Sequence, residues 1–166
     1  KLEAEGLAEN VPRKGFLVRG ISEKDVYDIY RIRGVLEELL CEYAAKEVDP
    51  VMIREGERIL EQAERNYHSG NFDGLRERHR EFNKWLRTTG SNRHLKLLLD
   101  RYENYVAILR DIVLMDTRRQ EEVLAEHWAI LNAVRAGDFV AARTAAQLHA
   151  MNSLKSVTAN IRSLGP

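Results

Sequence analysis

Polar side chains interrupt the apolar faces of four predicted helices, and this pattern limits how those helices can pack. The interrupting residues, each at helical spacing among apolar neighbours, are Arg33, His79, Asn83, His127 and His149. A buried polar group without a partner costs about 2–7 kcal/mol, so a fold that encloses these side chains must satisfy them. Either each has a local partner, or the helices bring them together around one polar cavity.

Capping residues and apolar periodicity predict an all-α fold. The short connections between helices favour an antiparallel bundle of about six helices over residues 21–163. The helix signals are a capping box at Ser22 and Asp25, an N-cap and first-turn proline at Asp49-Pro50, a stop at Ser69-Gly70, a helix from about Phe72 to Thr89, a stop and cap at Gly90-Ser91-Asn92, a start at Asp116-Thr117, and a stop and restart at Gly137-Asp138.

Composition indicates an ordinary globular domain. The 26 basic and 26 acidic residues balance, so net charge points neither to nucleic acid nor to a membrane surface. The single cysteine, Cys41, sits among apolar residues and is expected to be an inert core thiol in a reducing compartment. With no signal peptide and no apolar run near the ~18–20 residues that cross a bilayer, we expect a soluble, cytoplasmic chain without membrane contact.

The first 20 residues differ from the rest. Residues 1–9 have the pattern of a helix end, and residues 15–19 have a short strand pattern after a basic turn. About 20 residues are too few to form a domain of their own. We therefore interpret residues 1–20 as the remnant of another domain.

The interrupting residues are of types that bind metals and acids. Histidine nitrogen binds zinc or nickel, and Arg33 can pair with a carboxylate through its planar guanidinium. The stripe that carries His149 is small and polar, which favours either a cavity wall or close helix packing; it comprises Ala142, Ala145, Ala146, His149, Asn152, Ser153 and Ser156.

A purely structural role, without ligand binding, is the alternative for each of these residues. Every histidine alone fits a satisfied core residue, and Arg33 can form an ion pair with Glu37 one turn away. Tyr102 and Trp128 favour packing, although either can line a cavity. His68 and His94, near helix ends in polar surroundings, are expected on the surface.

An enzyme has less support in the sequence than a binding protein. The Glu-x-x-His pairs of di-iron bundles, HExxH, the P-loop and GxSxG are all absent. Glu126 directly precedes His127 and so points about 100° away around the helix. It can support a ligand, but no general base is evident. A metal-dependent enzyme acting on a small organic acid is the alternative reading.

Motifs along nearly the whole chain carry a family resemblance. Residues 1–10 and 12–19 resemble the end of the recognition helix and the wing of a winged helix-turn-helix. The matching residues in the remainder are Tyr30-Arg31-Ile32-Arg33, Leu36-Glu37, Phe82, Gly90-Ser91-Asn92, Glu126-His127, Ile130-Leu131, Ala133, Gly137-Asp138, Ala141-Ala142 and His149. With these motifs the chain resembles the GntR family of transcriptional regulators, and the remainder resembles the effector-binding FCD domain of its FadR subfamily.

The resemblance implies a ligand-responsive transcription factor, usually a homodimer on a palindromic operator. Many such domains hold a divalent metal through an aspartate and three histidines, and the metal helps bind a carboxylate effector. His127 and His149 match two of those histidines, whereas His79 stands where aspartate is common and Asn83 where the first histidine is common. Six helices fit the smaller VanR-like group.

These departures leave two versions of the site. Because asparagine is a poor ligand for zinc or nickel, the metal ligands are expected to be His79, His127 and His149, with Asn83 touching the ligand or a metal-bound water. Alternatively the metal is lost and the polar pocket binds the effector directly. Candidate effector contacts are Arg33, Asn83, Tyr102 and Asn152. With the helix-turn-helix almost entirely missing from these residues, we expect operator DNA to be bound only through that domain.

Overall fold

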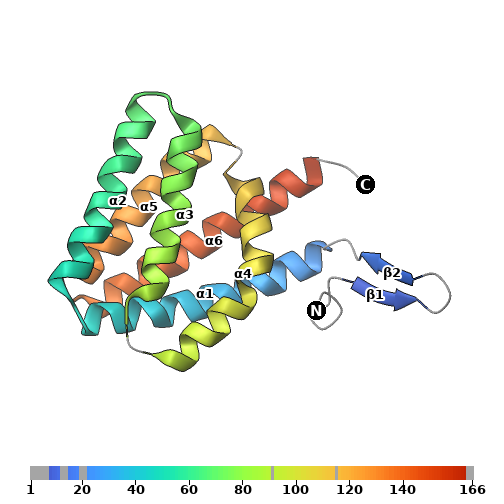
Figure 1. Cartoon of the computed structure of the whole chain (residues 1–166), viewed down its shortest axis with the longest axis horizontal. Helices are drawn as coiled ribbons and strands as arrows, with labels where there is room; N and C mark the ends of the chain where they lie inside the picture. The colour runs from blue at the N-terminus through green and yellow to red at the C-terminus, as the bar shows by residue number, and fades with distance from the viewer. Residues whose placement is uncertain (1–7, 12–14, 19–21, 91, 115, 164–166) are drawn as a thin grey trace.

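The computed structural model describes residues 8–11, 15–18, 22–90, 92–114 and 116–163. Within them six helices form the predicted all-α bundle, and two short strands precede the first helix (Figure 1). The elements are β1 (Ala8–Val11), β2 (Gly15–Val18), α1 (Glu23–Lys46), α2 (Pro50–His68), α3 (Phe72–Thr88), α4 (Arg93–Val113), α5 (Thr117–Arg135) and α6 (Phe139–Ser163). No helix in the described ranges is long and apolar enough to cross a membrane.

Local capping sets the helix ends where the sequence predicts them. Ser22 and Asp25 form the complete capping box of α1, and the Asp49 carboxylate accepts from the Val51 backbone N–H at 2.8 Å at the start of α2. Gly137 ends α5 in the left-handed region, with φ of 68°, a conformation that side chains with a Cβ rarely adopt. The confirmed caps fix the helix lengths that position the site.

The N-terminal head contains a hairpin where part of a helix was expected. Residues 8–9, assigned by sequence to a helix end, belong instead to β1, which pairs antiparallel with the predicted strand β2 from Ala8 opposite Val18 to Val11 opposite Gly15. The reason is that β2 supplies backbone hydrogen-bond partners that four residues alone lack. The rest of the expected helix end, residues 1–7, lies outside the described residues, as do residues 19–21, so the domain boundary stays a prediction.

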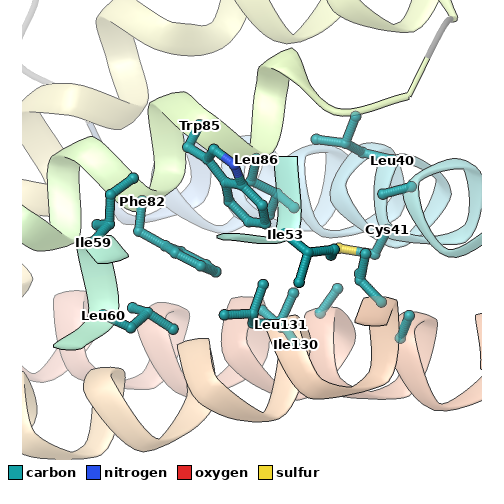
Figure 2. Close-up of a cluster of buried hydrophobic side chains, with 14 of the residues drawn as sticks. Leu40, Cys41, Ile53, Ile59, Leu60, Phe82, Trp85, Leu86, Ile130 and Leu131 are labelled. Atoms are coloured by element: carbon teal, nitrogen blue, oxygen red, sulfur yellow. The ribbon is translucent and has the colours of Figure 1, made fainter. Parts of the chain in front are cut away.

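Two apolar clusters hold the helices together. The larger cluster joins all six helices, and its central side chains include Phe82, Trp85 and Leu131 (Figure 2). Cys41 is fully buried there, and burial raises the pKa of its thiol, as expected for a packing residue. The smaller cluster joins α1, α4 and α6 through Val26, Tyr30, Leu109 and Val157.

Of the two roles expected for the small residues of α6, a cavity wall and close helix packing, the alanines have the second. Ala142 and Ala146 belong to the larger apolar cluster, and Ala150 lies against α1, where a Cβ added to Gly34 would come within 3.3 Å of it. Close packing therefore explains these three alanines.

Candidate functional site

A small polar cavity lies between α1, α3, α5 and α6, and it brings together four of the residues that the sequence singled out. Its volume is about 10 Å³, which is close to the space that one water molecule needs. One of its lining residues, Tyr30, belongs to the smaller apolar cluster. The cavity is lined by Tyr30, Arg33, His79, Asn83, Leu114, Val123, His149 and Ser153.

The three predicted histidine ligands form one group of rings. The ring centroids of His79 and His127 are 5.2 Å apart, and those of His127 and His149 are 5.0 Å apart. His127 also stacks on Phe82, with centroids 4.3 Å apart and ring planes 25° from parallel. The structure thus places imidazoles from α3, α5 and α6 side by side at the edge of the larger apolar cluster.

His79 is neutral and has one ring nitrogen to spare. Its Nε2 lies 3.0 Å from the Gln120 carbonyl oxygen, which can only accept, so Nε2 carries the proton. Burial lowers the pKa of His79 to about 3, although the bond to Gln120 opposes the shift. Among the described residues Nδ1 has no hydrogen-bond partner. A buried nitrogen lone pair therefore borders the cavity.

Asn83 is turned toward its own helix. Its side-chain Nδ2 donates to the His79 carbonyl oxygen at 2.8 Å, one turn earlier on α3. The side chain is 6% exposed and lines the cavity beside His79. This bond fixes the amide nitrogen to the backbone and leaves the amide oxygen as the group with which Asn83 can accept from a ligand.

Arg33 both forms the local ion pair and lines the cavity. Its Nε donates to Glu37 Oε1 at 2.8 Å, and the two side chains are 3% and 12% exposed. Burial lowers the pKa of Arg33, but the charge of Glu37 and its hydrogen bond to the guanidinium oppose that effect, and the net direction is upward. Within the described residues the bond to Glu37 uses Nε, so the two terminal nitrogens can donate to a further carboxylate.

A second polar cluster joins α5 to α6 next to the cavity. Arg119 makes two parallel bonds of 2.8 Å to the Glu126 carboxylate. His149 Nδ1 lies 2.7 Å from the same carboxylate, and Asn152 Nδ2 donates to it at 2.7 Å. Burial raises the pKa of Glu126, but the bonds from His149 and Arg119 outweigh burial and lower it to about 2.

Two of the predicted effector contacts are not brought to the cavity wall. Asn152 reaches Glu126 instead, and Tyr102 is half-buried on α4 and is not among the residues that line the cavity. His68 and His94 are exposed, as predicted.

Sequence reasoning missed Arg119 and Gln120, whereas Ser153, named in the stripe of His149, does line the cavity. Gln120 is 2% exposed and donates to the Leu114 carbonyl oxygen, and Arg119 is 4% exposed. The signal was present in the spacing, since Gln120 continues the stripe of His127 two turns earlier on α5.

The arrangement of ligand atoms differs from a ready-made metal centre. Across the described residues, no three His, Cys, Asp or Glu side chains are grouped so that they hold a metal ion in the conformation observed. The donor chemistry still suits zinc or nickel, because the rings are close together and His79 keeps an unbonded Nδ1.

The fold and this cavity define a helical domain with a buried polar site, and comparisons with known proteins place it in a family. Residues 28–152 match the family model described as the FCD domain. The chain belongs to the FCD domain family, as its sequence motifs indicate. A Bacillus subtilis (strain 168) protein, the uncharacterized HTH-type transcriptional regulator YdhC, is 33% identical over 135 residues, and that match covers 81% of this chain and 60% of YdhC.

Solved structures share the fold. E. coli McbR/YncC superposes with a TM-score of 0.77 at 16% identity, covering 94% of this chain and 74% of the other. Streptococcus agalactiae GntR gives a TM-score of 0.65 at 20% identity, covering 93% of this chain and 77% of the other. At these identities the likeness establishes the architecture alone.

Proposed function

We propose that this chain is the effector-sensing part of a DNA-binding transcriptional regulator, and that its polar cavity binds a small carboxylate. The observation that carries the proposal is Arg33, a buried guanidinium that lines the cavity and bonds Glu37 through Nε. Such a group binds a carboxylate through two parallel hydrogen bonds. The kinship with a regulator of the helix-turn-helix type supports the regulatory role.

Binding requires the cavity to grow. Its volume of about 10 Å³ holds about one water molecule, so an organic acid must favour a more open packing of the helices. A ligand shifts an equilibrium only when it binds one arrangement better than the other. We propose that this opening is what an N-terminal winged helix-turn-helix senses, and that the operator is bound through that domain.

A divalent ion, zinc or nickel, is part of the proposal. The ligands would be His79, His127 and His149, with Asn83 beside them. Because no three ligands converge in the described conformation, binding requires the rings to turn toward a common point. The ion would attract the effector carboxylate, and Arg33 would orient it.

The homodimer is proposed to form through α1 and α6. These helices are antiparallel neighbours, since Gly34 meets Ala150 while Arg143 contacts Glu38. Apolar residues at helical spacing on α1 and on α6 are therefore exposed on the same side of this helix pair. They are Ile32, Val35 and Leu39, which are 41%, 62% and 39% exposed, with Val140, Leu148 and Met151, which are 61%, 53% and 44% exposed. A second copy related by a twofold axis would cover this face.

Charges placed on this face are expected to dissociate the dimer. The variant V35E/L148E buries four carboxylates in the interface of two copies, which is strongly unfavourable. Light scattering should give a dimer for the natural chain and a monomer for the variant. V51E is the control, because Val51 is 63% exposed on α2, outside the face. A monomeric natural chain, or a dimeric V35E/L148E, would contradict the interface.

The enzyme alternative gains no support from the site. Glu126 is the carboxylate beside the histidines, and its pKa of about 2 makes it a weak proton acceptor. Its oxygens are occupied by Arg119, His149 and Asn152.

The proposed function is tested by metal content and ligand-dependent stability. Mass spectrometry of protein purified without a histidine tag should find about one zinc or nickel ion per chain, and H149A should lose it. Small carboxylates such as lactate, gluconate and benzoate should then raise the Tm. Without any ion or any stabilising acid, the chain would be a structural bundle.

A further inference from the structure

Glu126 connects the ion pair of α5 to one wall of the cavity. It is adjacent in sequence to His127, but its carboxylate contacts His149, which comes from α6. Both partners are largely buried, with side chains 11% and 6% exposed. The contact therefore acts on the orientation of a cavity residue, not on the histidine next to it in the chain.

The 2.7 Å distance between His149 Nδ1 and Glu126 Oε2 determines where the histidine proton lies. An ionised carboxylate only accepts hydrogen bonds, so Nδ1 must donate. In the neutral ring Nε2 is then the nitrogen with the lone pair. Since His149 lines the cavity with Nδ1 held on the Glu126 side, Nε2 is the nitrogen that can meet a ligand.

Arg119 keeps Glu126 in place and ionised. Two parallel bonds of 2.8 Å join the guanidinium to both carboxylate oxygens, and Arg119 Nη2 lies 3.4 Å from Ser153 Oγ on α6. Arg119 also pairs with the more exposed Glu122 at 3.1 Å. The carboxylate thus has one fixed position, and its only titratable partner from α6 in these contacts is His149.

We propose that Glu126 is a positioning residue that fixes the tautomer and ring orientation of His149, so that Nε2 is presented to whatever binds in the cavity. Histidines that bind metals or polar ligands commonly donate their other N–H to a carboxylate in this way. The nature of the ligand rests on the proposed function, but the tautomer does not.

The variant E126Q changes the tautomer without changing the size of the side chain. Arg119 Nη1 and Asn152 Nδ2 both donate to Oε1, so the amide oxygen of the new glutamine takes that position, while Arg119 Nη2 loses its acceptor at the other. The amide NH₂ group then faces His149 Nδ1, which must accept, and the proton moves to Nε2. E122Q is the matched control, since it also removes a carboxylate from Arg119 but leaves His149 untouched.

Nitrogen-15 NMR of the imidazole in metal-free protein reads the tautomer directly. We expect protonated Nδ1 on His149 in the natural chain and in E122Q, and protonated Nε2 in E126Q. Protonated Nε2 with unprotonated Nδ1 in the natural chain would overturn the proposal, and this measurement stands even when E126Q does not fold. An unchanged tautomer in a folded E126Q would overturn it as well.

Calorimetry with NiCl₂ separates this proposal from the proposed function. If the ion site exists, E126Q should bind nickel about 10–100-fold more weakly than the natural chain, and E122Q should bind equally well. If the natural chain binds no nickel while the tautomers behave as expected, the positioning role holds and the ion site fails. Equal nickel affinity in the natural chain and a folded E126Q would overturn the positioning role.

Discussion

Replacing Arg33 with glutamine is expected to weaken the binding of a small carboxylate by about 10–100-fold, since a hydrogen bond to a charged group contributes about 1.5–3 kcal/mol. The guanidinium is a permanently charged side chain on the cavity wall, whereas His79 on the same wall is neutral. Titration calorimetry with the acid that raises the Tm most gives the affinity. The bundle should remain folded when Glu37 is neutralised at the same time.

The variant E37Q decides between the two roles of Arg33. If Arg33 anchors the effector, E37Q removes a competing carboxylate at 2.8 Å and should bind the acid at least as well as the natural chain. R33Q/E37Q should then lose binding despite having no unpaired buried charge. If Arg33 serves only the ion pair, R33Q and E37Q should lower the unfolding free energy alike and leave acid affinity unchanged, which would contradict the proposed anchor.

The helices were predictable because their ends are determined locally. Ser22, Asp49 and Asp138 each accept a hydrogen bond from a backbone N–H of the first turn, so the residues that signal a helix start also form it. The hairpin at residues 8–18 was predicted only in part. Its first strand owes its conformation to pairing with the second, which a pattern of four residues does not encode.

The cost of burying unpaired polar groups left two outcomes open, local partners or one shared cavity. Arg33, His79, Asn83 and His149 line one cavity, and Arg33 and Asn83 also have local partners. Their bonding was not predictable. Asn83 turns toward the carbonyl oxygen of His79, and Arg33 uses Nε for Glu37 while its side chain also lines the cavity.

The sequence indicated that Glu126 can support a ligand, but not that its carboxylate contacts His149. Glu126 lies about 100° around α5 from His127, a direction that faces α6 in the folded chain. Arg119, two turns earlier, is of a residue type usually found on the surface, and its ion pairs with Glu126 and Glu122 offset the cost of burying it. Such pairs depend on how two helices cross, which helical periodicity does not specify.

Acid is expected to destabilise the metal-free protein through His79. The ring has an ordinary pKa of 6.5 in the unfolded chain and about 3 when folded, because burial penalises the charged form. Between these values the unfolded state binds a proton that the native state does not, so stability is complete above pH 6.5 and falls toward pH 3. Each pH unit in this window costs about 1.4 kcal/mol, or about 2 kcal/mol by pH 5.

The groups around His79 determine how cleanly this effect can be measured. Arg119 and His149 also lower its pKa, Glu126 and the Gln120 carbonyl oppose them, and His127 is in ring contact. H79Q keeps a donor for Gln120 but does not titrate. Urea unfolding with EDTA at one protein concentration, at pH 7 and pH 5, should show a loss about 2 kcal/mol larger for the natural chain than for H79Q. An equal loss in both would mean that His79 is protonated in the folded protein and that its Nδ1 is no lone-pair donor to the cavity.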